Sequence, residues 1–428
     1  MTSGAAGHDA PDRRGAAVEP PPRVLLVSST LDDDGGIPVC AGQLAGALAA
    51  AGIDVAVAGQ HAGALAAAVV AAREHGVDVR AIHEPWSLAG QWRAARRMRA
   101  TVRDLARAAR REGRRLVVHL HGVWVAPVAA AAAAAREEGA WLVVSPHGML
   151  RREALRKSRW RKTLVWQASL RGQLAGADTL HVTSPEEGSD LVALLPGCRP
   201  VLVPLGVTPP AAVPRTRGVG EPRLAGYLGR LLPIKNLDGL LQAWHRAAPP
   251  GWRLRIDGPG TAEIREALGA EARRLGIDGA VDFGGAVALE DLGTHFARLD
   301  LFILPSRSEA FALVVGEALA AGVPAIVTTA APWAEVEARG CGWSVPPDVG
   351  SLAGAIATAT ALDADDLAGR GEAGSRWVRR EYSWERIAAR HLAELYGAGR
   401  PAGSAAILAS PSSMGHASPN FSSVRNAP

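Results

Sequence analysis

The sequence has few cysteines and no long apolar segment. Three of its 428 residues are cysteine, Cys40, Cys198 and Cys341, and their odd number and wide spacing argue against a disulfide framework. No stretch approaches about 20 apolar residues without a charge, which excludes a transmembrane helix. Residues 1–22 lack the apolar core of a signal peptide. We therefore expect reduced thiols and a cytoplasmic location.

The composition is that of an ordinary globular protein. Hydrophobic residues make up 48% of the chain and charged residues 21%. A length of 428 residues is too great for one hydrophobic core and fits two domains of about 200 residues. Disorder is expected in residues 1–22, which contain a run of three prolines, and in residues 399–428, which are rich in serine, alanine and proline.

Both halves of the chain alternate short apolar segments with helical patterns. This alternation predicts two Rossmann-like, doubly wound α/β domains, 23–207 and 208–380, that face each other across a cleft. The Pro- and Gly-rich stretch 204–222 joins them. Strands are predicted at 24–29, 55–58, 116–121, 141–145, 179–183 and 201–204, and then at 224–228, 252–257, 281–283, 301–304, 325–328 and 343–345.

One predicted βαβ unit, residues 301–328, carries two carboxylates. Glu309 lies in the turn after the first strand and Glu317 in the helix, about 12 Å apart if every step between them is helical. They are too distant to share a proton or a metal, but they suit the two ends of an elongated ligand whose anionic middle lies at the helix N-terminus. A nucleotide diphosphate sugar has this layout. In the plainer alternative, Glu309 is an N-terminal helix acid and Glu317 a solvated helix residue.

A cationic loop follows the predicted strand 224–228. It contains Gly229, Arg230 and Lys235 and precedes an amphipathic helix. Two cations beside a strand end suit a pyrophosphate, whose departing charge must be stabilised when a glycosidic bond forms. Solvated loop cations are the alternative.

Histidines lie at two other predicted strand ends. His119 and His121 share one face of a strand, and His147 follows the next strand. A metal site is one interpretation, but no acidic or cysteine cluster adjoins these histidines in the sequence, so we predict none. A histidine satisfied within the core is the alternative for His121.

In order along the chain, these motifs resemble those of family 4 of the retaining glycosyltransferases, the glycosyl transferases group 1 of the GT-B fold. Residues 308–324 resemble the Glu-x7-Glu signature, 229–235 the Gly-Arg-x4-Lys motif and 34–37 the glycine loop. Glu381 to Arg386 resembles the start of the last helix in that family. The motifs around His121 and His147 resemble those of exopolysaccharide-type members. Alanine stands at 310 and 312, where the family commonly has glycine.

The resemblance implies a role for each motif. It assigns His147, Glu309, Arg230 and Lys235 to catalysis, with the two cations stabilising the leaving diphosphate. It places His121 and Trp124 on the acceptor side. The donor-binding residues that it implies are Gly35, Gly36, Gly229, Arg230, Lys235, Glu309, Ala310, Phe311, Ala312, Leu313 and Glu317.

The activity implied by the resemblance is transfer of a hexose-type sugar from a nucleotide diphosphate sugar, of unknown base, to an acceptor hydroxyl with retention. No metal or other cofactor is implied. Domain 23–207 would bind a glycan, lipid-linked or small-molecule acceptor, domain 208–380 would bind the donor, and helix 381–398 would return to the first domain. Exopolysaccharide or glycan biosynthesis is the implied setting. A secondary-metabolite glycosyltransferase, a GT-B nucleotide-sugar epimerase and a nucleotide-sugar-binding regulatory module are the alternatives.

Positive charge is concentrated in two segments. Ten arginines and only two acids lie between Arg93 and Arg115, and a second basic cluster spans 151–162. Such helices suit peripheral contact with an anionic membrane, here the inner face of the plasma membrane. Solvated helix faces are the plain alternative. Nucleic acid is not expected as a partner, because no nucleic-acid-binding module accompanies the charge.

Overall fold

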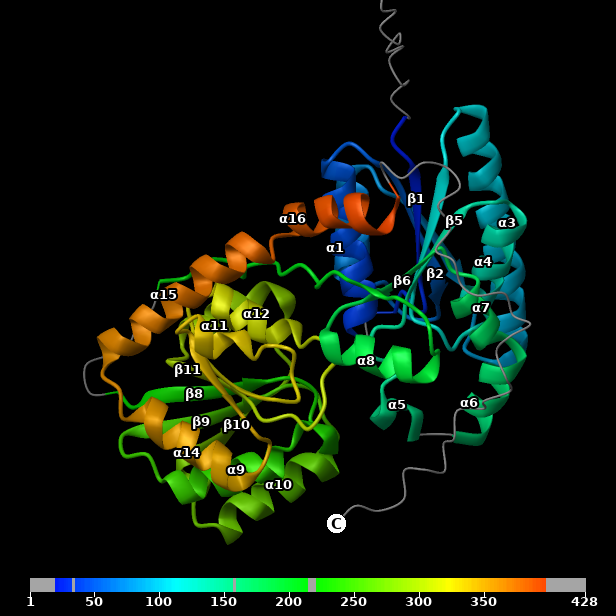
Figure 1. Cartoon of the computed structure of the whole chain (residues 1–428). Coiled ribbons are helices and arrows are strands. Elements are labelled where there is room, and N and C mark those ends of the chain that lie inside the picture. Colours follow the sequence, from blue (N-terminus) through cyan, green and yellow to red (C-terminus); the bar gives the residue numbers. More distant parts are fainter. Residues whose placement is uncertain (1–19, 33–34, 157–158, 215–220, 398–428) are drawn as a thin grey trace, which may run out of the picture.

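The computed structural model describes residues 20–32, 35–156, 159–214 and 221–397 and forms two α/β domains (Figure 1). The first sheet has the strand order β3-β2-β1-β4-β5-β6-β7 and the second the order β10-β9-β8-β11-β12-β13. Every pairing between strands within the two sheets is parallel. Both orders reverse direction beside the first strand, as in doubly wound folds, which confirms the predicted fold class.

The N-terminal sheet has one strand more than predicted. Its members are β1 (Arg23–Ser28), β2 (Asp54–His61), β3 (Asp78–His83), β4 (Leu116–His121), β5 (Trp141–Ser145), β6 (Thr179–Val182) and β7 (Val201–Leu202). The prediction of six strands was wrong because β3, an edge strand, is only partly buried and carries two charges, so it offers no apolar run. Around this sheet lie α1 (Gly36–Ala50), α2 (Ala67–Ala72), α3 (Leu88–Arg111), α4 (Ala126–Glu137), α5 (Arg152–Arg156), α6 (Arg159–Val165), a π-helical turn (Trp166–Leu170), α7 (Arg171–Ala175) and α8 (Pro185–Leu194).

The C-terminal sheet matches all six predicted strands to within one residue. It contains β8 (Arg223–Leu228), β9 (Trp252–Asp257), β10 (Val281–Phe283), β11 (Leu301–Leu304), β12 (Ala325–Thr328) and β13 (Gly342–Val345). The helices of this domain are α9 (Leu237–Ala247), α10 (Ala262–Arg274), α11 (Leu292–Ala297), α12 (Leu313–Ala320), α13 (Glu335–Ala338), α14 (Val349–Thr360) and α15 (Ala364–Glu381).

The chain then returns to the first domain through α16 (Trp384–Arg390) and a π-helical turn (His391–Leu395) (Figure 1). Ser383 caps α16 by accepting a hydrogen bond from the backbone N–H of Arg386. Ile387 and Leu395 are fully buried in a core cluster that includes residues of β1 and α1. The last helix thus fastens the C-terminal segment to the N-terminal domain, as predicted.

The return crossing depends on close packing at Gly206. A Cβ atom at this position would lie 2.3 Å from the indole ring of Trp384. We expect Gly206→Ala to lower the free energy of unfolding by about 1–3 kcal/mol, because overpacking displaces the ring and the start of α16. Gly354→Ala, at an open position on α14, is the matched control and should be neutral or stabilising by up to about 1 kcal/mol. Equal unfolding free energies of the two variants in urea would contradict this account of the crossing.

Candidate functional site

Two loops from opposite domains meet at the candidate site. A Cβ atom on Gly148, in the loop after β5, would lie only 2.6 Å from Cβ of Ala310, in the loop after β11. The Arg151 guanidinium, also from the N-terminal domain, donates a hydrogen bond to the backbone carbonyl of Glu309. The structure therefore brings the predicted His147 and Glu309 motifs together across the domain boundary.

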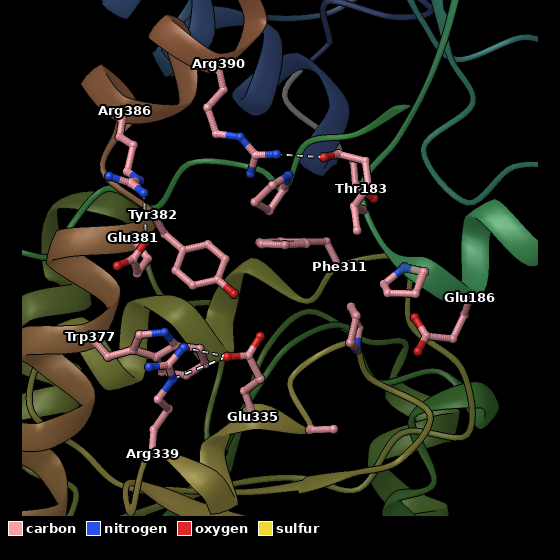
Figure 2. Close-up of a pocket in the computed structure, with 15 residues that line it drawn as sticks. Thr183, Glu186, Phe311, Glu335, Arg339, Trp377, Glu381, Tyr382, Arg386 and Arg390 are labelled. Carbon is pink, nitrogen blue, oxygen red and sulfur yellow. Dashed lines mark hydrogen bonds and ion pairs between the residues drawn. The ribbon is translucent and has the colours of Figure 1, made fainter. Parts of the chain in front are cut away.

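A cavity of about 420 Å³ also lies between the domains (Figure 2). Its walls come from the start of α8 and the end of β7, from the loops after β11 and β12, and from α13, α15 and α16. Phe311 is the only predicted donor-binding residue that lines it. Arg339 pairs with Glu335, and Arg386 with Glu381, so its main charges neutralise one another.

Lys235, predicted to contact the diphosphate, and Glu309, predicted to contact the sugar, form an ion pair with each other. Lys235 Nζ lies 2.5 Å from Glu309 Oε1, which also accepts a hydrogen bond of 2.6 Å from Ser306 Oγ. Both side chains of the pair are largely buried, with 18% and 10% of their surfaces exposed. Arg230 is exposed, and no side-chain partner for it exists among the described residues. The site thus holds one free cation and one cation already shared with a carboxylate.

Backbone constraints shape the loop around these cations. A Cβ atom on Gly258 would lie 1.9 Å from the carbonyl oxygen of Gly229, so the loops after β8 and β9 approach too closely for a side chain at 258. The Tyr227 hydroxyl donates a 3.0 Å hydrogen bond to the Arg230 carbonyl. Asn236, with φ 57°, donates to the Pro305 and Pro347 carbonyls at 3.0 Å each. These contacts fix the cationic loop beside the Glu309 turn.

Left-handed backbone is concentrated at the site. Among described residues other than glycine, only His147, Asn236, Ala248 and Ala312 have positive φ, and all but Ala248 belong to the site. Ala312 (φ 63°) immediately precedes α12, which has no side-chain cap. Glycine adopts this conformation without steric cost, which accounts for the family preference at this position. Strain of this kind persists where the surrounding structure enforces it.

Glu317 lies on α12 and is partly buried. Burial raises the pKa of its carboxyl group from 4.5 to about 7. No side chain in the described part of the chain forms a hydrogen bond or ion pair with it. Glu317 is therefore an isolated carboxyl group on α12, about one helical turn beyond the Glu309 loop. A carboxyl group without a protein partner can accept hydrogen bonds from a ligand.

The histidines form a buried cluster. His121 Nδ1 and His147 Nε2 are 2.8 Å apart, and the two rings are stacked at 5.0 Å. Burial lowers the pKa of His121 and brings that of His147 to about 4, so both imidazoles are neutral at pH 7. His119 instead bonds to the Tyr396 hydroxyl and to Ser145 Oγ, which makes it a satisfied core residue.

Trp124, predicted on the acceptor side, holds its own loop in place. Its Nε1 donates a 3.2 Å hydrogen bond to the Met149 carbonyl. Lys162 Nζ lies 5.4 Å from the centre of its ring. Trp124 therefore links the loop after β4 to the loop that carries His147.

Three residues of the site were not assigned to it from the sequence. The Glu187 carboxylate accepts hydrogen bonds from the backbone N–H groups of Gly148 and Thr183 and so positions the His147 loop. Its only sequence signal was a capping pattern, Ser-x-x-Glu, at the start of α8. Trp333 Nε1 donates a 2.6 Å hydrogen bond to the Phe311 carbonyl, in the loop between β11 and α12.

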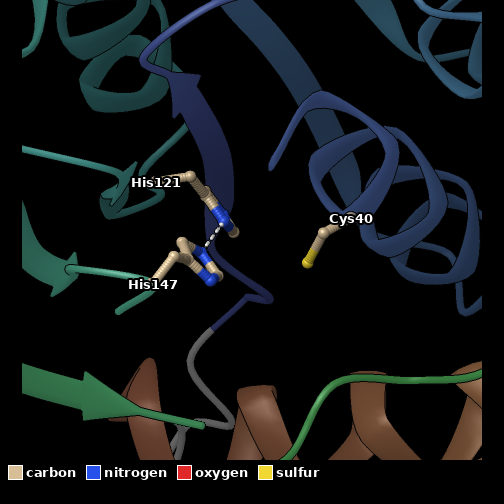
Figure 3. Close-up of side chains that lie close together, drawn as sticks. All are labelled: Cys40, His121 and His147. Atoms are coloured by element: carbon tan, nitrogen blue, oxygen red, sulfur yellow. Dashed lines mark hydrogen bonds between the residues drawn. The ribbon is translucent and has the colours of Figure 1, made fainter. Parts of the chain in front are cut away.

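Cys40, on α1, is the third missed residue. It corrects the expectation that no cysteine adjoins the histidines: one ligand atom from each of Cys40, His121 and His147 lies within 4.8 Å of the others (Figure 3). The sequence separates Cys40 from both histidines by several elements, so only the fold brings them together. All three cysteines are free and buried.

The glycine loop lies at the start of α1. Gly35 and Gly36 are exposed, and a Cβ atom at either would meet nothing within 4 Å. Asp34 lies outside the described residues. The helix begins at Gly36, and its first turn contains no acid.

The arginine-rich surface is more balanced than the sequence suggests. Arg99 and Arg103 pair with Glu137, and Arg110 pairs with Glu138, both from the neighbouring helix α4. At the start of α3, however, Leu88 and Trp92 are 84% and 70% exposed. In the second basic cluster, Arg151 and Arg152 contact Asp190, and the side chains of 156–161 lie outside the described residues. No helix of the described chain is long and apolar enough to cross a membrane.

Two family models match the chain. The model described as "Glycosyl transferase 4-like domain" matches residues 35–206, and "Glycosyl transferases group 1" matches residues 222–361. Together they cover most of both domains.

Two curated relatives align with the chain over part of their length. An exopolysaccharide phosphotransferase from Streptomyces coelicolor is 43% identical over 136 residues, which cover 30% of this chain and 14% of that protein. A GDP-mannose-dependent alpha-(1-6)-phosphatidylinositol monomannoside mannosyltransferase from Mycobacterium tuberculosis is 32% identical over 186 residues, which cover 40% and 47%. The chain thus spans less than half the length of these two relatives.

A solved structure supports the fold. HepE from Anabaena, in complex with UDP and glucose, superposes with a TM-score of 0.65 at 18% identity, covering 86% of this chain and 98% of that one. At this identity the likeness shows the two-domain GT-B architecture.

The raised pKa of Glu317 predicts that the free energy of unfolding decreases as the pH rises. Below pH 4.5 the carboxyl group is protonated in both the folded and unfolded states. As the pH rises from 4.5 to about 7, the unfolded state loses the proton while the folded state keeps it, so folding is destabilised by up to about 3 kcal/mol, and this cost stays constant above pH 7. We expect Glu317→Gln to unfold with a higher free energy than the wild type at pH 8 and with a difference under about 1 kcal/mol at pH 5. Equal differences at the two pH values in urea titrations would contradict this assignment.

The left-handed turn at Ala312 predicts a stabilising substitution. Ala312→Gly should raise the free energy of unfolding by about 0.5–1 kcal/mol, because relief of the left-handed strain exceeds the added entropy of the unfolded chain. Ala248→Gly, at a left-handed position outside the site, is the matched control and should stabilise similarly. Only Ala312→Gly should alter the affinity for a nucleotide sugar, measured by calorimetry. An equal change in affinity for Ala248→Gly would show that the turn at Ala312 has no specific role in binding.

Proposed function

We propose a retaining sugar transfer for this chain, which belongs to the glycosyl transferases group 1 family and is a glycosyltransferase of GT-B type. The observation that carries the proposal is the Lys235–Glu309 pair beside the unpartnered Arg230. In the proposed reaction, a hexose leaves a nucleotide diphosphate and joins an acceptor hydroxyl with its anomeric configuration unchanged.

Donor binding would exchange the partners of the buried pair. A diphosphate placed between Arg230 and the start of α12 gives Lys235 a more highly charged partner than Glu309. Glu309, released from Lys235, then accepts hydrogen bonds from hydroxyl groups of the sugar. Ser306 Oγ, already bonded to Glu309, keeps the carboxylate oriented during this exchange.

Glu317 would bind the ribose. Its carboxyl group has no protein partner and can accept hydrogen bonds from two adjacent hydroxyl groups. Such bonds favour the ionised form and oppose the rise in pKa that burial causes. Binding of the donor would thereby offset the free-energy cost of ionising the Glu317 carboxyl group.

The transfer step itself needs no general base from the protein in this proposal. The acceptor oxygen bonds to the anomeric carbon as the bond from that carbon to the phosphate oxygen breaks, and the acceptor proton passes to a phosphate oxygen. Arg230 and Lys235 stabilise the charge on the leaving diphosphate. His147, whose loop touches the Glu309 turn, lies on the opposite wall and orients the sugar.

The donor and acceptor are proposed by class. The solved relative bound to UDP and glucose and the GDP-mannose-dependent relative support a nucleoside diphosphate hexose. The exopolysaccharide phosphotransferase supports a glycan acceptor. Exposed Leu88 and Trp92 beside the arginines of α3 support a lipid-linked acceptor reached by peripheral membrane contact on the cytoplasmic side. A GT-B epimerase would need several carboxylates near the sugar, whereas Glu309 is the one that we place there among the described residues.

The exchange of partners predicts distinct effects of two substitutions. Lys235→Ala should weaken both a nucleoside diphosphate and its sugar conjugate at least about tenfold, because it removes a phosphate contact. Glu309→Ala should weaken only the sugar conjugate, because it frees Lys235 for phosphate. Both should lose nearly all transfer while keeping the wild-type circular dichroism spectrum. Calorimetry with UDP, GDP, ADP and their hexose conjugates measures these affinities.

Arg307→Ala is the matched control for these variants. Arg307 lies in the same turn as Glu309 but is half exposed and pairs with Asp238. It should bind and transfer like the wild type. Wild-type turnover of either Lys235→Ala or Glu309→Ala would remove that residue from the proposed mechanism.

A further inference from the structure

We propose that Cys40, His121 and His147 form a binding site for a divalent transition metal ion of the zinc class. The three residues come from separate elements: α1, the end of β4 and the loop after β5. Figure 3 shows the Cys40 sulfur directed from α1 toward the two imidazole rings. One ligand atom from each residue lies within 4.8 Å of the other two.

The spacing of the ligand atoms is close to that of a metal site. Zinc–sulfur and zinc–nitrogen bonds of about 2.3 and 2.0 Å in a tetrahedron place ligand atoms roughly 3.3–3.6 Å apart. The observed upper limit of 4.8 Å therefore needs a contraction of roughly 1.2–1.5 Å. Rotation of the His147 side chain can supply movement toward the buried Cys40, since His147 is only partly buried.

The chemistry of the three donors selects the class of ion. One thiolate and two neutral imidazoles are preferred by zinc and its neighbours in the first transition series, and not by magnesium or calcium, which take oxygen ligands. Three protein ligands leave a fourth position for water. On binding, the Cys40 thiol gives up its proton to solvent and its sulfur bonds to the metal.

One ring nitrogen in the cluster lacks a partner. His121 Nε2 is buried and makes no hydrogen bond, whereas the satisfied core histidine, His119, bonds through both ring nitrogens. A buried polar atom without a partner carries a free-energy cost, and a polar ligand in the cluster would remove it. This unsatisfied nitrogen is independent of the spacing and also points to a ligand.

The position of the site gives it a regulatory consequence, which rests on the proposed function. Gly148 touches Ala310, so the loop of His147 forms one wall of the sugar site. A metal ion that holds His147 toward Cys40 draws its imidazole away from the donor. Zinc therefore inhibits transfer by weakening the binding of the nucleotide sugar.

Cobalt(II) is the probe for the site, because a thiolate ligand gives it a charge-transfer absorption band. The full-length protein, stripped with a chelator, is titrated with cobalt(II) and then with zinc in competition. We expect one equivalent to bind with a thiolate band that zinc abolishes. Cys40→Ser should lose the band and bind at least about 100-fold more weakly, since it loses a direct ligand.

Cys198→Ser and Cys341→Ser are the matched controls, because both thiols are buried outside the cluster. Each should keep the band and the affinity, which assigns the band to Cys40 even if Cys40→Ser does not fold. Absence of a thiolate band in the wild type, or its loss in either control, would overturn the site.

The inhibitory role is tested separately by calorimetry. Zinc at saturation should weaken nucleotide-sugar binding to the wild type at least about tenfold and leave Cys40→Ser unaffected. Tight metal binding without an effect on donor affinity would overturn the inhibition and keep the site. Failure of the proposed function is a different result: no nucleotide sugar would bind the metal-free protein at all.

Discussion

The buried ion pair between Lys235 and Glu309 is the interaction on which the site depends. It joins the loop after β8 to the loop after β11, the two strand ends at the centre of the C-terminal sheet. The N-terminal domain closes on the same point, because Arg151 bonds to the Glu309 carbonyl and Gly148 packs on Ala310. Glu309 thus contacts both domains: its carboxylate pairs with Lys235 of its own domain, and its backbone carbonyl accepts a hydrogen bond from Arg151 of the opposite domain.

The same region holds local costs that the rest of the fold must offset. Ala312, Asn236 and His147 adopt left-handed backbone conformations, and the partly buried Glu317 has no side-chain partner among the described residues. Features of this kind lower the free energy of unfolding by about 1–3 kcal/mol each, which is significant beside the roughly 5–15 kcal/mol net stability of a domain. They occur where a ligand would contact the protein and are absent from the well-packed centres of the sheets. This placement is expected of a binding site for a polar ligand, where packing in the two cores offsets the local loss of stability.

The sequence predicted what local patterns determine. Strands β11 and β12 of the C-terminal domain are buried apolar runs between turn residues, and the limits of all six strands of that sheet were correct to within one residue. The Glu309 and Lys235 motifs were recognisable because each lies in one short loop. By contrast, β3 was missed because an edge strand needs no continuous apolar run.

Contacts between distant segments were not predictable from local patterns. Cys40 meets His121 and His147 only through the order of strands in the sheet, and Glu187 reaches Gly148 from a helix that follows it by several elements. The arginines of α3 seemed unbalanced because their acids, Glu137 and Glu138, come from α4. The pairing of Lys235 with Glu309 was likewise not foreseen, although both residues were assigned to the donor.

The most direct test is a crystal structure of the wild-type protein with a bound nucleoside diphosphate hexose. The account predicts that Lys235 Nζ moves beyond about 4 Å from Glu309 Oε1, the limit of an ion pair, and contacts a phosphate oxygen. Glu309 should then accept a hydrogen bond from a sugar hydroxyl and Glu317 from the ribose. An intact Lys235–Glu309 pair, with the donor bound elsewhere, would contradict the central claim.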